Sequence, residues 1–157
     1  MDDTAYVALT KAMMPGMFRM AYSILNHRQD AEDAVQQALL NAWQHRKKAR
    51  AGAEKAWMMR IVINASYDLG RRRRRAVPVP EVPKAGACSE EIECTGMYDL
   101  IRGLPEILRT PFLLKYMEGM TEKEVSAAMH IPLTSVKNRL FRARTALQKE
   151  LREEAAR

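Results

Sequence analysis

Cysteine and aromatic residues are scarce in this 157-residue chain, which has two cysteines and an aromatic content of 6%. Cys88 and Cys94 share a polar stretch without a nearby histidine, and this argues against a zinc site. A structural disulfide is not expected in a reducing compartment, so two ordinary thiols are predicted, with a redox sensor as the alternative. We therefore expect no metal and no cofactor.

Long apolar runs are also missing, because no stretch approaches the roughly 20 residues that span a bilayer. The first residues lack the basic and apolar segments of a signal peptide, which predicts a cytoplasmic protein. The sequence contains no glycine-rich phosphate loop, metal-ligand cluster or nucleophile–base set. An enzyme acting on a small-molecule substrate is therefore not expected.

Positive charge is what the chain has in excess, with a net charge of +7. This favours a polyanionic partner, although RNA, DNA and anionic lipid fit the charge equally well. The excess lies in two basic blocks on either side of an acidic connector. A length of 157 residues suits one domain or two small ones.

Residues 121–144 predict a helix, a tight turn and a second helix. Thr121 is expected to cap the first helix, with Glu124 closing a capping box. Pro132 forces the turn, and Thr134 or Ser135 offers the next N-cap hydroxyl. The second helix buries a stripe of apolar residues at helical spacing, namely Val136, Leu140, Ala143, Leu147 and Leu151.

The opposite face of this second helix carries a phenylalanine among cations and an amide. Its residues are Lys137, Asn138, Phe141, Arg142 and Arg144. Lysine, arginine and asparagine reach base edges in the major groove, and an apolar group can touch a thymine methyl. The pattern predicts a DNA-reading helix; a solvated basic helix and a protein-binding helix pair are the alternatives.

The N-terminal half predicts three helices. Residues 4–25 have helical spacing interrupted at Pro15, which favours two short helices or one kinked one. Asp30 is expected to cap the second helix. Its predicted inner face is Ala31, Ala34, Val35, Ala38, Leu39, Ala42 and Trp43. Its outer face is Glu32, Asp33, Gln36, Gln37 and Asn41, which either solvates the helix or docks on another protein.

A basic loop at 46–54 precedes a third helix predicted over 55–73. Its outer stripe is Arg60, Asn64, Tyr67 and Arg71, at spacings of three and four residues. Five consecutive arginines at 71–75 end the helix, and Asp68 is expected to pair with Arg71 or Arg72. The cations suit a helix C-terminus in any case, but beside this stripe they indicate a surface for a nucleic-acid backbone with bases nearby.

Residues 76–97 are rich in proline and small polar residues, which predicts a flexible linker. A short helix follows from Tyr98, and another begins at Pro105 and ends before Gly119, with a kink or shifted start at Pro111. The predicted core of that helix is Ile107, Leu108, Phe112, Leu113, Tyr116 and Met117. The chain is thus predicted to be all-α, with two small helical domains at 1–75 and 98–157.

Taken in order, residues 30–36, 57–73 and 104–144 resemble the extracytoplasmic-function (ECF) class of bacterial sigma-70 family RNA polymerase sigma factors. The resemblance implies sigma region 2 at 1–75 and region 4 at 98–157. It implies promoter-specific transcription initiation, with core RNA polymerase and promoter DNA as partners and no reaction catalysed by this chain. An anti-sigma factor, often membrane-anchored, is the further partner that the family implies.

The resemblance also implies residue roles. Core polymerase contacts fall on Glu32, Asp33, Gln36, Gln37 and Asn41. The residues expected to bind the minus-ten element are Lys47, Lys48, Arg50, Trp57, Arg60, Asn64, Tyr67 and Arg71. In the minus-thirty-five element, bases face Lys137, Asn138, Phe141 and Arg142, and phosphates face Thr134, Ser135, Arg139 and Arg144.

Two departures from the family pattern affect region 4, because Thr134 stands where glycine is usual and Asn138 where serine is usual. A free-standing helix-turn-helix repressor or activator is the alternative function, but it explains only residues 99–157.

Overall fold

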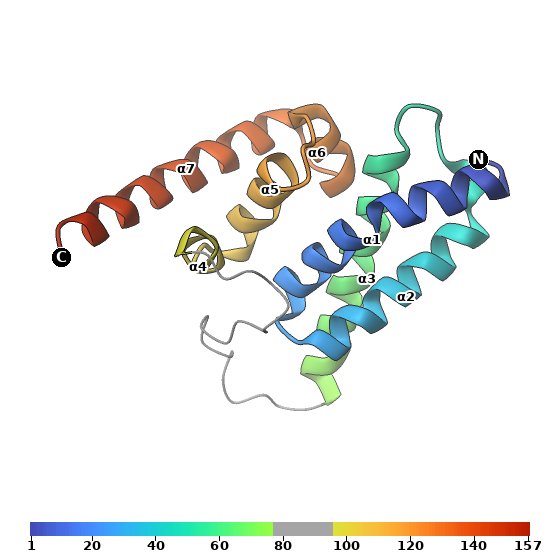
Figure 1. The fold of residues 1–157 in the computed structure, drawn as a ribbon, viewed down its shortest axis with the longest axis horizontal. Helices are drawn as coiled ribbons and strands as arrows, with labels where there is room; N and C mark the ends of the chain where they lie inside the picture. The colour runs from blue at the N-terminus through green and yellow to red at the C-terminus, as the bar shows by residue number, and fades with distance from the viewer. Residues whose placement is uncertain (77–95) are drawn as a thin grey trace.

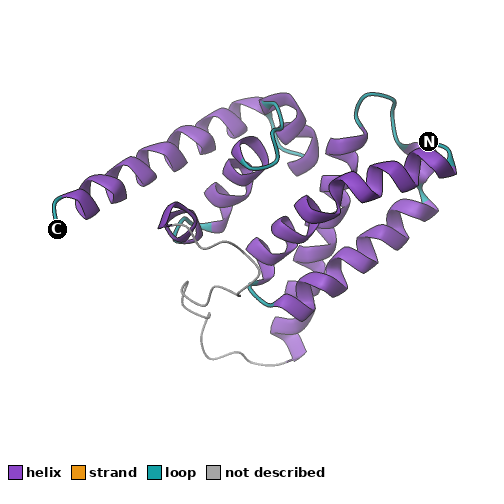
Figure 2. Ribbon diagram, viewed as in Figure 1, coloured by secondary structure: helices purple, strands orange, loops and turns teal. Residues whose placement is uncertain are grey.

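The computed structural model describes residues 1–76 and 96–157, and every regular element in these ranges is a helix (Figures 1 and 2). This confirms the all-α prediction. The elements are α1 (Asp3–Leu25), α2 (Arg28–Gln44), the short 3-10 helix η1 (Arg46–Lys48), α3 (Glu54–Ala76), α4 (Gly96–Arg102), α5 (Glu106–Tyr116), α6 (Glu122–Met129) and α7 (Leu133–Ala155). The two cysteines and nearly all of the predicted linker lie outside the described residues.

Helix α1 continues through Pro15, so one helix forms where the sequence allowed two. The Asp2 side chain caps it by accepting a hydrogen bond of 2.7 Å from the Ala5 N–H. Asn26 ends it in a left-handed conformation with φ of 53°, which asparagine tolerates better than most residues.

Two predicted N-caps are wrong, and the local chemistry explains both. Helix α2 begins at Arg28, and its cap is His27, whose Nδ1 accepts a hydrogen bond of 3.2 Å from the Asp30 N–H. Asp30 therefore sits inside the first turn. Helix α7 begins at Leu133 with Pro132 as its cap, where the fixed proline φ of −60° leads into the helix without a side-chain bond.

The capping box of α6 is confirmed. The Thr121 hydroxyl accepts from the Glu124 N–H at 3.2 Å, and the Glu124 carboxylate accepts from the Thr121 N–H at 3.2 Å. This fixes the start of the helix-turn-helix. His130 ends α6 with φ of 58°, and the chain turns directly into α7.

Helices α1, α2 and α3 form an N-terminal bundle around Met17, Met20 and Met58, which are all fully buried. The buried face of α2 is largely alanine, which lets its neighbours approach closely. Trp43, predicted on that inner face, is instead 39% exposed. It packs edge-on against Tyr6 at 5.1 Å, while the Arg46 guanidinium lies over its ring at 3.8 Å.

Helices α4 to α7 form a C-terminal module, whose core includes Leu114, Val125, Val136 and Leu140. Four residues predicted to be buried are 40–49% exposed: Ile107, Tyr116, Met117 and Leu151. Tyr116 and Met117 come where α5 ends. Leu151 belongs to the last turns of α7 (Leu133–Ala155), and the C-terminal end of that helix runs beyond the rest of the module (Figure 1).

The two modules pack against each other, with α6 on α3 and α5 on α1, and their buried residues form one continuous core (Figure 1). Helix α3 is consequently buried on two sides. Met58 and Val62 lie in the predicted inner face, but Met59 and Ile63 are also only 2% and 3% exposed. The sequence did not predict this second buried face.

Candidate nucleic-acid interface

The outer face of α7 is open to solvent. Phe141 is 62% exposed, the largest exposed fraction among the large apolar side chains of the described residues. Lys137, Asn138 and Arg142 are exposed beside it, whereas Val136 and Leu140, one residue before Lys137 and Phe141, are fully buried. The buried stripe therefore holds the helix in place while the cations, the amide and the ring project outward.

The phosphate-contact residues predicted on α7 are less uniform. Thr134 and Arg144 are exposed, while Ser135 and Arg139 are half-buried. Arg144 donates a hydrogen bond of 3.1 Å to the Tyr116 hydroxyl, which ties it to the end of α5. The predicted residues thus share one helix, but they do not have equal access to a ligand.

An acidic group lies at the edge of this basic face. The Glu122 carboxylate accepts a hydrogen bond of 2.9 Å from the Lys115 ammonium. That bond lowers the pKa of Glu122, and the charges of Lys115, Lys137 and Arg144 lower it further. Glu122 is therefore ionised at neutral pH and reduces the positive potential near the start of α7.

A second candidate surface is a hollow of about 610 Å³ between α2 and α3. Its lining is Gln37, Asn41, His45, Lys48, Trp57, Ile61, Asn64, Ala65, Asp68 and Arg72. Residues predicted for two different partners meet here, because Gln37 and Asn41 come from the predicted polymerase surface and Trp57 and Asn64 from the predicted minus-ten surface. The Gln37 amide donates to the Asn41 amide oxygen at 3.0 Å, so the two amides act as a pair.

The basic loop borders this hollow. Lys48 lines it, whereas Lys47 and Arg50 are exposed outside the lining, as is Arg60 on α3. Arg46 holds the loop in position, since it donates to the Asp3 carboxylate at 2.9 Å and to the Trp43 carbonyl at 2.8 Å. Lys47, Lys48 and Arg50 therefore belong to a loop whose first residue is held in place by hydrogen bonds.

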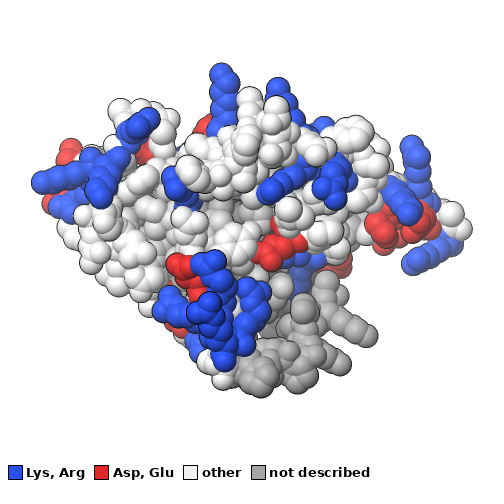
Figure 3. Space-filling model, turned by 180° about the vertical axis from the view of Figure 1, so that it is seen from behind, with Lys and Arg blue, Asp and Glu red and all other residues white. Residues whose placement is uncertain are grey.

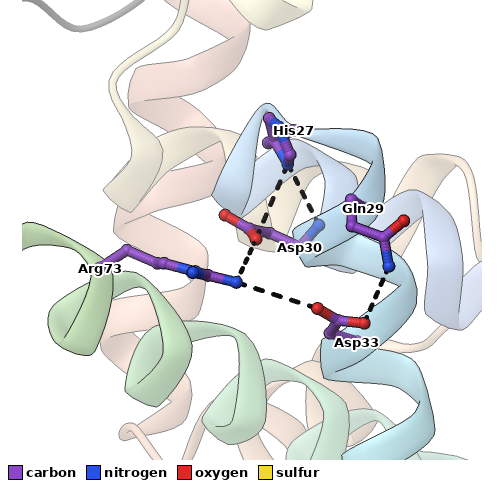
Figure 4. Close-up of polar contacts among 5 residues, drawn as sticks. All are labelled: His27, Gln29, Asp30, Asp33 and Arg73. Carbon is purple, nitrogen blue, oxygen red and sulfur yellow. Dashed lines mark hydrogen bonds and ion pairs between the residues drawn. The ribbon is translucent and has the colours of Figure 1, made fainter.

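The arginines at the end of α3 are all exposed, and Figure 3 shows a dense group of Lys and Arg side chains next to the grey segment, where α3 ends. The predicted ion pair between Asp68 and Arg71 is confirmed. Arg73 differs from its neighbours because it turns back to α2, where it contacts Asp30 at 3.1 Å and Asp33 at 3.9 Å (Figure 4). The other arginines are thus the candidates for phosphate binding.

The same contact affects the predicted polymerase surface. Asp33 also accepts a hydrogen bond of 3.0 Å from the Gln29 amide (Figure 4), so its carboxylate is held in a defined position. Between the amides of this α2 face stands Leu40, which is 59% exposed. Sequence reasoning missed it, although its position four residues after Gln36 places it on the outer stripe.

Tyr67 lies on its predicted stripe, and together with Asn64, Asp68, Arg71 and Arg74 it lines a hollow of about 380 Å³. Tyr67 is half-buried, and α5 of the C-terminal module covers it. Burial raises the pKa of the Tyr67 hydroxyl, and the nearby Glu106 carboxylate raises it further. Tyr67 therefore contributes both to this hollow and to the contact with the other module.

Comparison with known proteins assigns both modules. The family profile "Sigma-70 region 2" matches residues 9–76, and "Sigma-70, region 4" matches residues 96–147. The chain belongs to the sigma-70 family. It is an ECF sigma factor, and members of this family are transcription initiation subunits without enzymatic activity; region 4 is their DNA-binding helix-turn-helix.

Individual relatives agree with this assignment. The sigma factor is 29% identical to the RNA polymerase sigma-H factor of Pseudomonas aeruginosa, over 96% of this chain and 88% of the relative. It is 24% identical to the ECF RNA polymerase sigma factor SigW of Bacillus subtilis, over 97% and 91%. The solved sigma factor RpoE of Bartonella quintana, in complex with the anti-sigma factor NepR, matches 94% of this chain and 97% of its own with a TM-score of 0.76 at 24% identity.

Residues 1–76 and 96–157 contain no helix long and apolar enough to cross a membrane. The same residues hold no cluster of histidine, cysteine and acidic side chains suited to a metal ion.

Proposed function

We propose that this sigma factor directs core RNA polymerase to its promoters through two separate surfaces, with α7 on the minus-thirty-five element and the α2–α3 hollow on the minus-ten element. The observation that carries the proposal is the exposed Phe141 between cations on the second helix of the helix-turn-helix. An aromatic ring exposed to water makes no apolar contact, whereas in a major groove it can pack against a thymine methyl group.

On the upstream element, Lys137, Asn138 and Arg142 would contact base edges. Each good base contact gives about 1–3 kcal/mol of discrimination. Thr134, Ser135, Arg139 and Arg144 would contact phosphates, which supply affinity that falls steeply with salt. The departures at Thr134 and Asn138 predict an altered approach to the backbone and an altered recognised sequence.

On the downstream element, the α2–α3 hollow would capture a base extruded from the duplex. Extrusion costs about a few kcal/mol per base. Stacking on Trp57 returns about 1–3 kcal/mol, and the amides of Asn41 and Asn64 can hydrogen-bond the Watson–Crick edge. The hollow is large enough for one base. Backbone phosphates would be held by Lys47, Lys48, Arg50, Arg60, Arg71, Arg72, Arg74 and Arg75.

The polymerase would dock on the outer face of α2, which carries Glu32, Asp33, Gln36 and the exposed Leu40. An exposed leucine among polar side chains suits a protein interface, because such interfaces combine an apolar centre with a polar rim. Because Gln37 and Asn41 line the hollow, we assign them to the downstream DNA as well as to this face. We also propose that the protein acts in the cytoplasm and is held inactive by an anti-sigma factor.

Run-off transcription tests the function directly. Purified core polymerase with this chain, supplied with genomic fragments, is expected to start RNA at a few defined positions that share an upstream and a downstream element. Core enzyme alone is the control. Starts that are no more selective with the chain than without it, or failure of the chain to co-elute with core polymerase in gel filtration, contradict the proposal.

A further inference from the structure

Helix α1 contacts the end of α2 through two side chains to which the proposed function gives no DNA contact. Asp3 and Tyr6 are three residues apart, so they lie on one face of α1. Tyr6 is buried and its hydroxyl donates a hydrogen bond of 2.7 Å to the Leu39 carbonyl, whereas the Asp3 carboxylate accepts one of 2.9 Å from Arg46. The start of α1 therefore lies beside the segment that joins α2 to α3 (Figure 1).

Arg46 is the centre of this contact. Its guanidinium lies 3.8 Å from the centroid of the Trp43 ring, and it donates to the Trp43 carbonyl at 2.8 Å as well as to Asp3. Tyr6 packs edge-on against the same Trp43 ring at 5.1 Å. Only 23% of the Arg46 side chain is exposed. A planar guanidinium that is held by a ring face and by two oxygens is fixed in both position and orientation.

The loop that follows Arg46 has little support of its own. The 3-10 helix η1 is only three residues long. Gly52 has a φ of 86°, and a Cβ added there would meet nothing within 4 Å, so this part of the loop is open. Within the described ranges, the side chains of Lys47, Lys48 and Arg50 make no hydrogen bond or ion pair. Arg46 therefore supplies the side-chain hydrogen bonds that hold the loop.

Arg46 lies between two residues of the α2–α3 hollow. His45 and Lys48 both line the hollow, whereas Arg46 turns away from it toward α1. The Lys48 N–H donates to the His45 carbonyl at 2.9 Å, so the two lining residues belong to one tight turn that contains Arg46. The anchoring of Arg46 therefore sets the position of Lys48 at the wall of the hollow.

The position of this wall affects one part of DNA binding more than the others. Stacking on Trp57 is tolerant of sequence, because every base has an aromatic face. Attraction between exposed cations and phosphates carries no sequence information. Discrimination between bases depends on polar groups that are held at the base edge by supporting contacts. Loss of the loop anchor should therefore reduce base preference and leave backbone binding unchanged.

We propose that Arg46 is a positioning residue for the downstream element: held by Asp3 and by the Trp43 ring, it fixes the loop wall of the α2–α3 hollow and thereby sets which base the hollow prefers. This inference rests on the proposed function, because it requires that the hollow takes up a base. It gives α1 a part in base selection, although no residue of α1 lines the hollow.

Five labelled single strands of equal length test the proposal without a known promoter. Four of them carry one base, A, C, G or T, at the centre of an abasic backbone, and the fifth is abasic throughout. Fluorescence anisotropy of the full chain with each strand separates base uptake from backbone attraction. Wild type is expected to bind its best one-base strand about tenfold more tightly than the abasic strand, the order expected for one stacked base.

Arg46→Lys keeps the charge but loses the planar group that stacks and donates in fixed directions. It is expected to bind the abasic strand as wild type does. The ratio of affinities between the best and the worst one-base strand should fall about threefold, the order of one exposed cation–π contact. Trp43→Leu removes the ring beneath the guanidinium and should act in the same direction, whereas Trp43→Phe keeps a ring face and should retain most of the ratio. Arg28→Lys, the same substitution at the opposite end of α2, is the control and should change neither quantity.

Asp3→Asn distinguishes positioning from a direct phosphate contact by Arg46. Positioning predicts a lower ratio between the one-base strands, by about twofold, because the ion pair is exposed on the Asp3 side. A direct phosphate contact predicts the opposite behaviour: Arg46 released from the carboxylate would bind phosphate better and tighten binding to all five strands equally. Equal tightening would therefore overturn the positioning role.

The remaining outcomes also separate the two proposals. Unchanged ratios in Arg46→Lys and Trp43→Leu, beside a clear preference in wild type, would overturn the positioning role and leave the proposed function intact. Equal weakening on all five strands in Arg46→Lys would overturn it as well, because the substitution would then act on backbone binding or on folding. Wild type that binds the five strands equally would contradict both proposals, since the hollow would take up no base.

Discussion

The two modules offer nucleic acid opposite shapes. The C-terminal module presents a convex helix, from which Phe141 projects between exposed polar and basic side chains. The N-terminal module presents a hollow between two helices, lined by amides and by Trp57. A projecting helix fits the major groove of an intact duplex, and a hollow fits a single base outside it. Under the proposed function, one module would read DNA before melting and the other would read it after.

The largest expected effect comes from removing a buried side chain that holds the projecting helix α7 in place. Leu140→Ala deletes a fully buried side chain beneath α7 and is expected to cost about 2–5 kcal/mol of unfolding free energy. Denaturant unfolding followed by circular dichroism measures it. Phe141→Ala, one residue later but exposed, serves as the control and should change stability by less than about 0.5 kcal/mol. Similar losses in the two variants would mean that α7 is not oriented as described.

A crossed pair of variants sharpens the comparison. Trp57→Ala is expected to weaken binding to single-stranded downstream DNA by about 1–3 kcal/mol through lost stacking. Phe141→Ala or Arg142→Ala should weaken binding to the upstream duplex by a similar amount and leave polymerase binding intact. Anisotropy on both probes, taken from a promoter mapped by run-off transcription, tests both. If either variant bound both probes more weakly, the two modules would not bind the upstream duplex and the downstream single strand separately.

The sequence predicted those features that depend on neighbours along the chain. The capping box at Thr121 and Glu124 and the stripe through Val136 and Leu140 follow from local spacing, and the structure confirms them. The N-cap at His27 was missed, because an imidazole nitrogen is a less common capping acceptor than a carboxylate, and the carboxylate of Asp30 lies close by in the sequence.

Features that depend on the other module were not predictable in this way. Helix α3 contacts α6 of region 4 as well as α1 and α2, and Met59 and Ile63 are buried on it, whereas the sequence shows only that apolar residues are adjacent there. The hollow likewise combines Asn41 of α2 with Asn64 of α3, and periodicity on one helix cannot show which second helix completes a site. Tyr67 was placed correctly on its stripe, but its cover comes from α5.

A smaller effect separates the polymerase face from the DNA hollow within the N-terminal module. Asp33→Ala is expected to weaken assembly with core polymerase, because it removes a positioned carboxylate from the outer face of α2 (Figure 4). Arg73→Ala removes only the exposed cation that faces Asp33. Exposed ion pairs contribute about 0–1 kcal/mol of stability, so this variant is expected to have the smaller effect on assembly with polymerase. Titration of labelled variants with core enzyme measures both. Unchanged polymerase affinity in Asp33→Ala would refute this docking assignment.

The smallest expected effect concerns the acidic group beside the projecting helix. Lys115 holds the pKa of the Glu122 carboxyl below its usual value of 4.5, with help from Lys137 and Arg144. Because the folded-state pKa is depressed, the stabilisation is present above the unfolded value and is lost as pH falls through the folded one.

Glu122→Gln should therefore lower the melting temperature slightly at pH 7, and the difference from wild type should vanish in acid once the wild-type carboxyl is protonated. The same variant should bind upstream duplex slightly more tightly at low salt, since a negative charge beside Lys137 is gone, and equally at high salt because screening removes the difference. No hollow-lining residue contacts Glu122 in this way, so single-strand binding should not respond. A change in single-strand binding would mean that the charge of Glu122 in the C-terminal module affects DNA binding by the N-terminal module.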